Sequence, residues 1–361
     1  MGAAVDVPAT GRGDRERATR SGVRAHPAWF GAVMGTGALS LALAGESVHW
    51  LSSALHGAAV AALWLATLYA VLLSPRYLGR LRRRAGLAGE IADPARGPML
   101  ATFPAGILVL ALAWGRVGGM TVPATAASAI AIALLAIGVL GALAYGIAWT
   151  AILLRSTIAV EQVNGGWLIP PVMTLLVPLG VQPLVQRFPG AAPLLVMVGF
   201  AFLGIGALVF LALFGLLMMR LALHTPLPGP LAPSLLIPLA PAPVLGLATL
   251  RLLQLSQAHG VAGFGGTGAG LALSAVGLGF AGWWLAVVAI ELGRLHRLEG
   301  LSSHPGWWGF VFPIGALVLT TDAMGTAMGS SPLIWTGLVG MAVLLLIWLA
   351  IAARTARDMF R

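Results

Sequence analysis

The sequence predicts an all-α membrane protein of ten transmembrane helices, arranged as five helical hairpins in which one helix of each pair is interrupted. Composition is the first observation: of 361 residues, 59% are hydrophobic and 9% are charged, whereas about a quarter of a soluble domain is charged. Secondly, apolar runs near the roughly 20 residues that cross a bilayer recur along the whole chain. Thirdly, proline or glycine interrupts alternate runs at a nearly constant spacing.

Ten apolar runs are bounded by polar residues or by Gly/Pro clusters, and each is long enough to form a span. The runs cover about 27–44, 50–73, 98–115, 122–149, 165–183, 191–219, 231–252, 264–292, 305–323 and 332–353. The count falls to nine if the short, interrupted fifth run is a re-entrant loop instead of a span.

The arginines decide between nine and ten. All 21 basic residues are arginines. With a cytoplasmic N-terminus, eighteen of them lie on the cytoplasmic side, which leaves three outside: Arg116, Arg187 and Arg251. Positive residues favour the cytoplasmic side of a membrane, so both termini are expected there. This requires an even number of spans and therefore supports ten.

These observations divide the chain into three parts. Residues 1–26 are expected to form a disordered basic cytoplasmic tail, because they are rich in arginine and have no apolar core of their own. Residues 27–354 form the ten-helix domain, and residues 355–361 form a cytoplasmic C-terminal tail. The expected location is the cell (plasma or inner) membrane, with the lipid bilayer around the helices.

The interruptions in the odd-numbered runs reveal an internal repeat. "TFPAG" (102–106) in the third run matches "VFPIG" (311–315) in the ninth, and "LIPPV" (168–172) in the fifth matches "LIPLA" (236–240) in the seventh. The repeated prolines recur at a nearly even interval along the chain, and they are Pro104, Pro170, Pro238 and Pro313.

Gly35, in "VMGTG" of the first run, stands one such interval before Pro104 and completes a series of five. Proline inside a helix removes a hydrogen bond and bends the chain. Irregular backbone at membrane depth is tolerated where protein or a water-filled cavity surrounds it. We therefore expect five broken inner helices around a common axis, inside a ring of continuous helices. The alternative for any one proline is a tolerated kink without function.

Polar residues within the spans favour an anion as the permeating species. Buried acids mark proton and cation pathways, but the acids that follow the N-terminal tail, Glu46 and Asp322 among them, are expected in loops or at span ends. The polar groups expected in mid-span are neutral hydroxyls, namely Thr36, Thr102, Thr174, Ser234 and Thr320. Together with the three outer arginines, such a lining suits an anion. Alternatively, each hydroxyl bonds back to its own helix, and the arginines anchor span ends.

Other classes of function lack their residues. The seven histidines stand mostly in loops or near span ends, the wrong places to hold a central haem. Neither an acid pair nor a Ser/His arrangement is expected at membrane depth. We therefore expect no enzymatic activity, no cofactor, no metal and no nucleic-acid partner.

Four segments resemble one known family. They are "HPAWFGAVMGTGALS" (26–40), "GWLIPPVMTLLVPLG" (166–180), "PLPGPLAPSLLIPLAPAP" (226–243) and "WWGFVFPIG" (307–315). The chain is identified from them as a member of the tellurite-resistance/dicarboxylate transporter family, which includes the plant slow-type anion channel. The resemblance extends over essentially the whole chain from residue 26.

The resemblance implies quasi-fivefold symmetry, five kinked helices that line a pore, and a homotrimer with one pore per subunit. It also implies an aromatic gate at the phenylalanine before the proline of the ninth span, which is Phe312. Phe103 occupies the matching place in the third span and is a second candidate gate. Gly35, Thr36 and the four repeated prolines are expected to line or kink the pore.

The expected function is an anion channel or transporter for small anions, such as chloride, nitrate, sulfite or four-carbon dicarboxylates like malate. The "HPAWFGAVMGTGALS" segment favours the dicarboxylate and sulfite exporters of the family. The alternative is a proton-coupled exporter of dicarboxylate, sulfite or tellurite in place of a passive channel.

Overall fold

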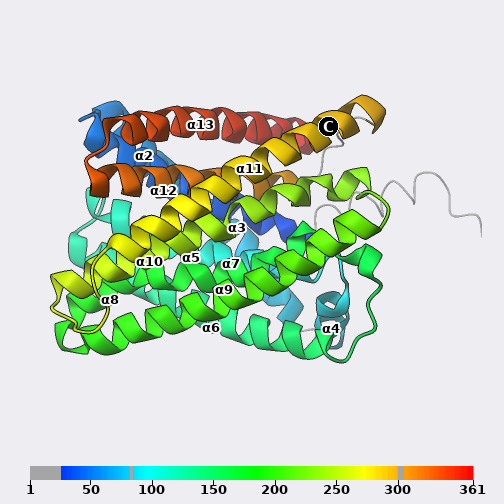
Figure 1. The fold of residues 1–361 in the computed structure, drawn as a ribbon, viewed down its shortest axis with the longest axis horizontal. Helices are drawn as coiled ribbons and strands as arrows, with labels where there is room; N and C mark the ends of the chain where they lie inside the picture. The colour runs from blue at the N-terminus through cyan, green and yellow to red at the C-terminus, as the bar shows by residue number, and fades with distance from the viewer. Residues whose placement is uncertain (1–25, 82–83, 300–304, 361) are drawn as a thin grey trace, which may run out of the picture.

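The computed structural model describes residues 26–81, 84–299 and 305–360, and within these residues every regular element is a helix (Figure 1). Ten segments are long and apolar enough to cross a membrane. They lie close to the predicted runs and extend over Pro27–His49, Ser53–Gly79, Pro98–Met120, Ala124–Leu153, Gly165–Arg187, Pro189–Leu223, Gly229–Ala258, Gly268–Leu298, Gly306–Met328 and Ser331–Asp358. The predicted all-α fold of ten spans is confirmed. The tail predicted over 1–26 lies outside the described residues, apart from residue 26.

The odd-numbered spans lie inside the molecule and the even-numbered spans lie outside. In chain order, the most apolar stretches of the odd spans are 89, 83, 78, 78 and 67% buried, whereas those of the even spans are 28, 28, 28, 28 and 17% buried. The outer spans expose large apolar side chains, such as Leu140, Leu208 and Ile290. Lipid can cover such side chains because it is itself apolar.

The helices of the inner spans are α2 (Gly31–His49), α5 (Thr102–Val117), α7 (Ile169–Leu176) with α8 (Val181–Arg187), α10 (Pro241–Ala258) and α12 (Val311–Met328). The outer helices are α3 (Ser53–Leu81), α6 (Ala124–Leu153), α9 (Ala192–Leu223), α11 (Gly268–Glu299) and α13 (Ser331–Phe360). The short helix α4 (Arg84–Ala92) lies between the first two hairpins. The segment predicted as a C-terminal tail thus continues α13 as far as Phe360.

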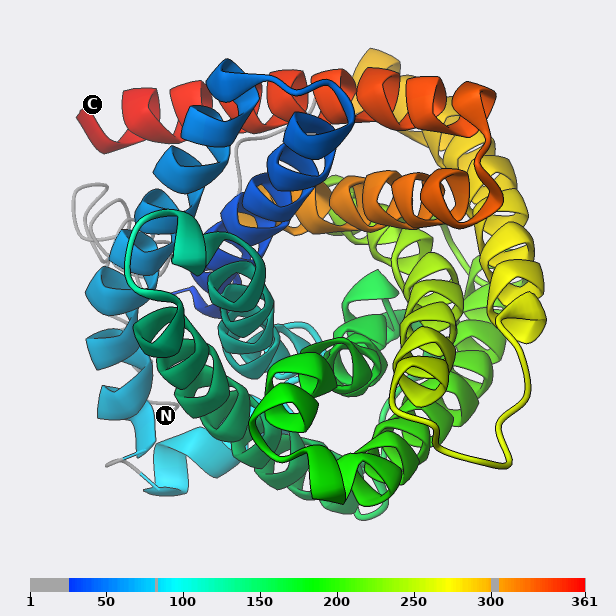
Figure 2. The same cartoon turned by 90° about the vertical axis from the view of Figure 1, so that its left-hand side faces the viewer.

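The five hairpins close into a ring (Figure 2). Each inner helix contacts the next, in the order α2, α5, α7, α10 and α12, and α12 contacts α2 again. Each outer helix packs against the inner helix before it and against the following one, as α3 does between α2 and α5. The hairpins therefore surround one central axis. That a fivefold rotation relates them stays a prediction.

Every inner span begins with a 3-10 helix at the same end of the ring. These segments are η1 (Pro27–Phe30), η2 (Pro98–Ala101), η5 (Gly165–Leu168), η8 (Gly229–Leu239) and η9 (Pro305–Phe310). Further short 3-10 segments are η3 (Gly118–Met120), η4 (Val160–Gln162), η6 (Val177–Gly180) and η7 (Pro189–Ala191).

The repeated prolines stand near the junctions where a 3-10 segment gives way to α-helix. Pro104 and Pro313 are the third residues of α5 and α12, Pro170 is the second residue of α7, and Pro238 is the last but one residue of η8. Proline is tolerated in a first helical turn because its missing N–H has no helical partner there. The repeated interruption thus takes the form of a change in helix type. A bend at each junction stays a prediction.

Candidate functional site

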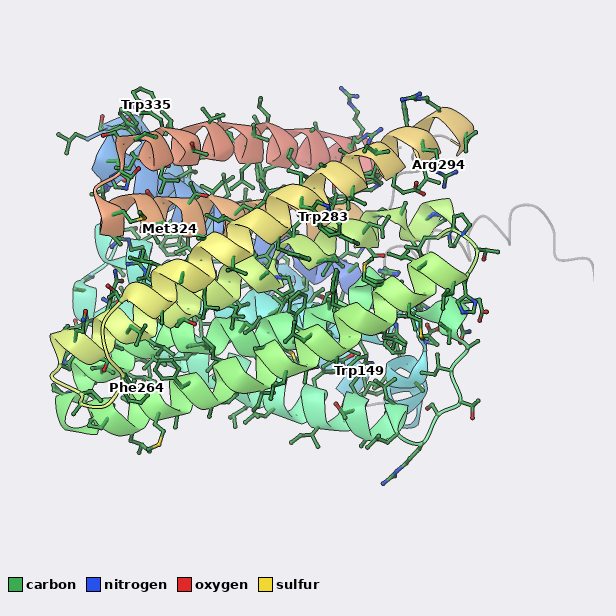
Figure 3. All side chains as sticks on the ribbon, in the orientation of Figure 1. Trp149, Phe264, Trp283, Arg294, Met324 and Trp335 are labelled. Atoms are coloured by element: carbon green, nitrogen blue, oxygen red, sulfur yellow. The ribbon has the colours of Figure 1, made fainter. Side chains whose placement is uncertain are left out.

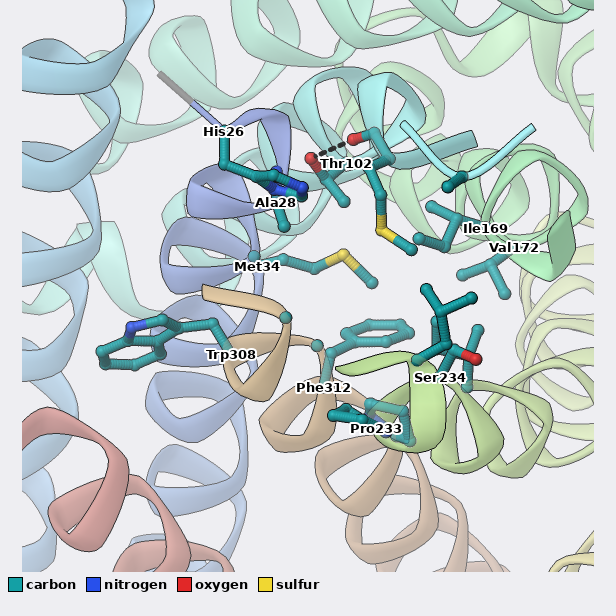
Figure 4. A pocket seen from close by; sticks show the side chains of 18 of the residues that line it. His26, Ala28, Met34, Thr102, Ile169, Val172, Pro233, Ser234, Trp308 and Phe312 are labelled. Carbon is teal, nitrogen blue, oxygen red and sulfur yellow. Dashed lines mark hydrogen bonds between the residues drawn. The ribbon is translucent and has the colours of Figure 1, made fainter. Parts of the chain in front are cut away.

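A cavity of about 200 Å³ lies where the 3-10 ends of the five inner spans meet. All five inner spans contribute side chains to it, as Figure 4 shows at close range. Representative lining residues, in chain order of the spans, are Met34, Thr102, Val172, Ser234 and Phe312. We call this space the Phe312 cavity. Because every inner span lines it, the cavity lies on the axis of the ring.

Phe312 is the second residue of α12, and its ring extends into the middle of this cavity (Figure 4). The side chain is only 4% exposed. Met34, from the neighbouring helix α2, also points into the cavity in this view. Pro313 follows Phe312 and lines the same space. An aromatic ring and a thioether thus project into the cavity at this depth and make its lining apolar.

A second and larger space, of about 690 Å³, opens at the other end of the inner helices. It too is lined by all five inner spans, and its charged or titratable residues are His49, Arg116, Arg251 and Asp322. We call it the Arg116 vestibule. Two of the three predicted outer arginines are therefore brought together in one space, whereas Arg187 does not line it.

The two spaces share no lining residue. On α2 the Phe312 cavity ends at Met34 and the Arg116 vestibule begins at Leu41, a separation of about 10 Å at 1.5 Å per residue. The layer between them contains packed small residues. For example, a Cβ atom built on Gly315 lies 2.8 Å from the Cβ of Ala38. The two spaces are therefore separate in this structure, and Phe312 lines the one at the 3-10 ends of the inner spans.

Arg96 supplies a positive charge to the otherwise mainly apolar Phe312 cavity. It lies between α4 and η2, in a turn whose backbone N–H groups at residues 95 and 96 both donate to Asp93 Oδ1 at 2.8 Å. Its Nε is buried and has no hydrogen-bond partner within the described part of the chain. A buried donor without a partner is costly, so an anion in the cavity would find an unsatisfied cation there.

Several predicted lining residues face away from the axis. Thr36 is fully buried, and its hydroxyl accepts a hydrogen bond from Trp348 Nε1 of α13 at 2.9 Å. Gly35 lets α2 approach α12, since a Cβ there lies 2.7 Å from the Cβ of Val311. Pro104 faces α6, where a Cβ on Gly141 lies 3.3 Å from it.

Pro170 and Pro238 are buried but do not line either space. Of the repeated prolines, Pro313 alone lines the Phe312 cavity. The Phe312 cavity is therefore lined by residues near the repeated prolines more than by the prolines themselves.

The mid-span hydroxyls mostly follow the alternative interpretation, in which they bond back to their own span. Thr174 donates to the carbonyl of Pro171 and Thr320 to that of Ala316, both at 2.8 Å. Thr102 lines the cavity but donates to the carbonyl of Met99 at 2.7 Å. Ser234 also lines it, and its Oγ accepts from the backbone N–H of Gly165 at 3.1 Å.

Phe103, the second candidate gate, packs in an aromatic cluster beside the axis. Its ring centroid lies 4.7 Å from that of Phe30 and 5.0 Å from that of Tyr77. Tyr77 belongs to the outer helix α3 and donates a hydrogen bond to the carbonyl of Pro27. Phe103 lines neither axial space, so its surroundings favour a packing role.

The expectation that no acid is buried in the spans is wrong. Glu46 belongs to α2 and is fully buried, and the side chain of Asp322, on α12, is only 14% exposed. His49 Nε2 lies 2.5 Å from Asp322 Oδ1. The sequence places these residues near span ends, but the ends of α2 and α12 are covered by α13, which sequence position alone does not reveal.

A closed ring of hairpins with a basic vestibule and an apolar cavity, each lined by all five inner spans, is the architecture of a membrane transport protein. Comparison with known proteins gives the particular family. Residues 24–356 match the SLAC1 family of voltage-dependent anion channels, and the chain belongs to this family. The resemblance found in the sequence is thereby confirmed.

Individual relatives are each 25% identical to this chain. An uncharacterised transporter of Methanocaldococcus jannaschii is 25% identical over 310 residues, which cover 82% of each chain. A sulfite efflux pump of Arthroderma otae is 25% identical and covers 91% of this chain and 89% of its own. The sulfite efflux pump of Trichophyton rubrum is 25% identical, and the match covers 93% of this chain and 92% of the pump.

Proposed function

We propose that the protein moves small anions along the axis of the ring, as a channel or transporter gated by Phe312. The candidate anions are chloride, nitrate, sulfite and four-carbon dicarboxylates such as malate. The observation that carries the proposal is the Phe312 ring, which stands in a cavity lined by all five inner spans. Family membership supports anions as the transported class. The sulfite efflux pumps among the relatives favour sulfite as one of the candidate anions.

The gate acts by steric block and by exclusion of water. An apolar ring in a narrow passage cannot replace the hydration shell of an anion, so the passage stays dry and closed. Arg96 on the cavity side and Arg116 with Arg251 in the vestibule place positive charge at both approaches. Charge of one sign that lines a cleft raises the local concentration of counter-ions. The arginines thus attract the anion and the ring decides when it passes.

Truncation of Phe312 tests the gate. We expect Phe312→Ala to raise nitrate and chloride flux into proteoliposomes severalfold, while Phe312→Leu stays mostly closed because a branched apolar side chain still fills the axis. If the ring is only core packing, its loss leaves a cavity that costs about 3–5 kcal/mol by analogy with soluble cores. Nitrate and chloride flux then falls together with yield and thermal stability, whereas the loss of a gate raises the flux.

Phe103→Ala is the matched control, since Phe103 has the same "FP" context but packs against Phe30 and Tyr77. It should lower thermal stability without raising flux. A well-folded Phe312→Ala protein with unchanged or lower flux, or a Phe103→Ala protein with raised flux, contradicts the assignment of the gate to Phe312.

Proton-coupled export of dicarboxylate, sulfite or tellurite is the second candidate function. The buried pair of acids, Glu46 and Asp322, favours it, because buried acids in membrane helices are typical of proton pathways. Flux of labelled nitrate, sulfite and malate with and without a pH gradient separates a passive channel from a coupled carrier. A channel responds to the pH gradient only through the charge of the anion itself.

The assembly proposed for the chain is a homotrimer with one pore per subunit. Apolar side chains exposed on the outer helices, such as Leu208, Ile290 and Leu346, offer surface for contacts between subunits as well as with lipid. Small residues along such faces let helices approach closely. Mass measurement in mild detergent should give three chains, and a monomer at every protein concentration contradicts the trimer.

A further inference from the structure

Two acids and a histidine gather where α2, α12 and α13 meet beside the Arg116 vestibule. His49 Nε2 lies 2.5 Å from Asp322 Oδ1 and 3.3 Å from the hydroxyl of Thr326. Trp50 Nε1 donates to Glu46 Oε2 at 2.8 Å. His49 and Asp322 line the vestibule, whereas Glu46 lies behind them and is fully buried. The cluster thus connects the vestibule with a carboxyl group inside the protein.

The second oxygen of Glu46 has no partner. Glu46 Oε1 is buried, and it forms no hydrogen bond within the residues that the structure describes. A buried carboxylate oxygen without a donor is strongly unfavourable, whereas a protonated carboxyl group is much less costly to bury. Asp322 Oδ1 also forms no hydrogen bond within these residues, but it lies 2.5 Å from His49 Nε2. The geometry therefore leaves Glu46 Oε1 as the oxygen of the cluster that is open to a proton.

Glycines let Glu46 and Asp322 pack close to each other. A Cβ atom built on Gly337 of α13 lies 3.0 Å from Glu46 Oε1 and 3.8 Å from Asp322 Cβ, so both acids cover the same glycine. A Cβ on Gly45 lies 2.7 Å from Asp322 Oδ2. Two carboxyl groups that share a confined space do not both ionise readily, and one of them retains a proton to a higher pH.

The groups that face the cluster from other elements are mainly cationic. Arg116 of α5 and Arg251 of α10 line the same vestibule. The neighbouring α3 has an exposed His56 in its first turn. The two remaining neighbours are neutral near the cluster, since α13 has no titratable side chain before Arg354 and α11 has none before Glu291.

We propose that Glu46, together with Asp322 and His49, is a proton-binding site that couples anion movement to protons from the Arg116 vestibule. The proposal rests on the proposed anion transport and deepens its proton-coupled form. A proton from vestibule water reaches the cluster through His49 and Asp322, which line the vestibule, and binds to Glu46 Oε1. The cluster then carries one negative charge less. The positive charges of Arg116 and Arg251 are then less offset by the acids, so the vestibule attracts an anion more strongly. When the proton leaves, that attraction weakens.

Nitrate is the probe of choice, because its charge does not change between about pH 5 and pH 8, where histidine and perturbed carboxyl groups titrate. Purified full-length protein is reconstituted in liposomes with the voltage held near zero by potassium and valinomycin. In the wild type we expect nitrate flux to rise severalfold when the vestibule side is acidified. A nitrate gradient should also drive proton movement, seen with a pH-sensitive dye.

Glu46→Gln keeps an acceptor for Trp50 and imitates the protonated acid. We expect it to transport nitrate at all pH values with a rate that changes less than twofold, and to move no protons with it. Glu291→Gln is the matched control, because Glu291 is paired with Arg294 on α11, away from the cluster. This control should keep the pH response of the wild type.

Either of two results overturns the proposal. One is a wild-type protein that conducts nitrate without pH dependence and without proton movement, which needs no variant. The other is a Glu46→Gln protein with the pH dependence of the wild type. Absence of nitrate flux in the wild type and in Phe312→Ala contradicts the proposed anion transport itself, so the two failures are distinguishable.

Discussion

At the scale of single residues, the direction of a side chain decides whether it serves the axis or the packing around it. Thr36 and Phe312 are both buried on inner helices, yet Thr36 bonds to Trp348 of the outer helix α13 while Phe312 fills the axial cavity. Each residue advances a helix by about 100°. Because the polar residues of α2 are not gathered on one side, no polar face in its sequence marks the side that faces the axis.

Only part of the candidate site could therefore be predicted. Phe312 could be found because the motif "WWGFVFPIG" resembles a known family, whereas its repeat partner Phe103 lies in an aromatic cluster. Arg96 and Met34 could not be found, since their place at the cavity depends on five spans that meet in space. The burial of Glu46 could not be predicted for the same reason, because the helix that covers it, α13, is distant in the sequence.

Arg96 offers a prediction at this scale. Replacement by glutamine removes the positive charge beside Phe312, so the anion is less concentrated in the cavity. We expect Arg96→Gln to lower nitrate flux severalfold and Arg96→Lys to restore part of it, measured in proteoliposomes. Arg155→Gln is the control, because Arg155 is exposed and lines neither axial space. Equal flux in Arg96→Gln and in the control contradicts a role for Arg96.

At the scale of elements, the repeat in the sequence corresponds to a change of helix type near each repeated proline. A 3-10 segment stands at the start of each inner span, whereas a break within each of these spans stays a prediction. The sequence could indicate the place, because proline disrupts helical hydrogen bonding. It could not indicate the 3-10 form, since this depends on how the five span ends pack around the cavity.

Glycines set how closely the helices of a hairpin approach. On α11, a Cβ built on Gly277 lies 2.4 Å from the carbonyl oxygen of Ala242, whereas Gly279 has no neighbour within 4 Å. We expect Gly277→Ala to push α11 from α10 and to destabilise the protein by about 1–3 kcal/mol. Gly279→Ala should be neutral or slightly stabilising, because alanine favours helix. Thermal unfolding in detergent compares the two, and equal transition temperatures contradict this packing.

At the scale of the whole molecule, span number and the alternation of inner and outer helices could be predicted from hydropathy, arginine distribution and the proline repeat. These signals are visible in the sequence because the bilayer restricts the length and the polarity of every span. Closure of the ring follows from contacts between α12 and α2, which are far apart in the chain. No local pattern encodes such a contact, so the closure of the ring could not be derived from local sequence.

The orientation of the molecule in the membrane also belongs to this scale. Arg294 lies at one end of the molecule, while Trp335 and Phe264 lie at the opposite end (Figure 3). The Arg116 vestibule opens at the end where α2 finishes and α3 starts. From the positive-inside rule we propose that the Arg294 end faces the cytoplasm, so that the vestibule exchanges protons and anions with the outside of the cell.

Introduced cysteines test this orientation, because the chain has no cysteine of its own. Ser156 is exposed in the loop after α6, on the proposed cytoplasmic side, and Gly190 is exposed between α8 and α9, on the opposite side. A membrane-impermeant maleimide added to intact cells should label Gly190→Cys and leave Ser156→Cys unlabelled until the cells are opened. Both variants should conduct nitrate like the wild type. The reverse labelling pattern contradicts the proposed orientation and places the vestibule on the cytoplasmic side. The protons of the Glu46 cluster then come from the cytoplasm.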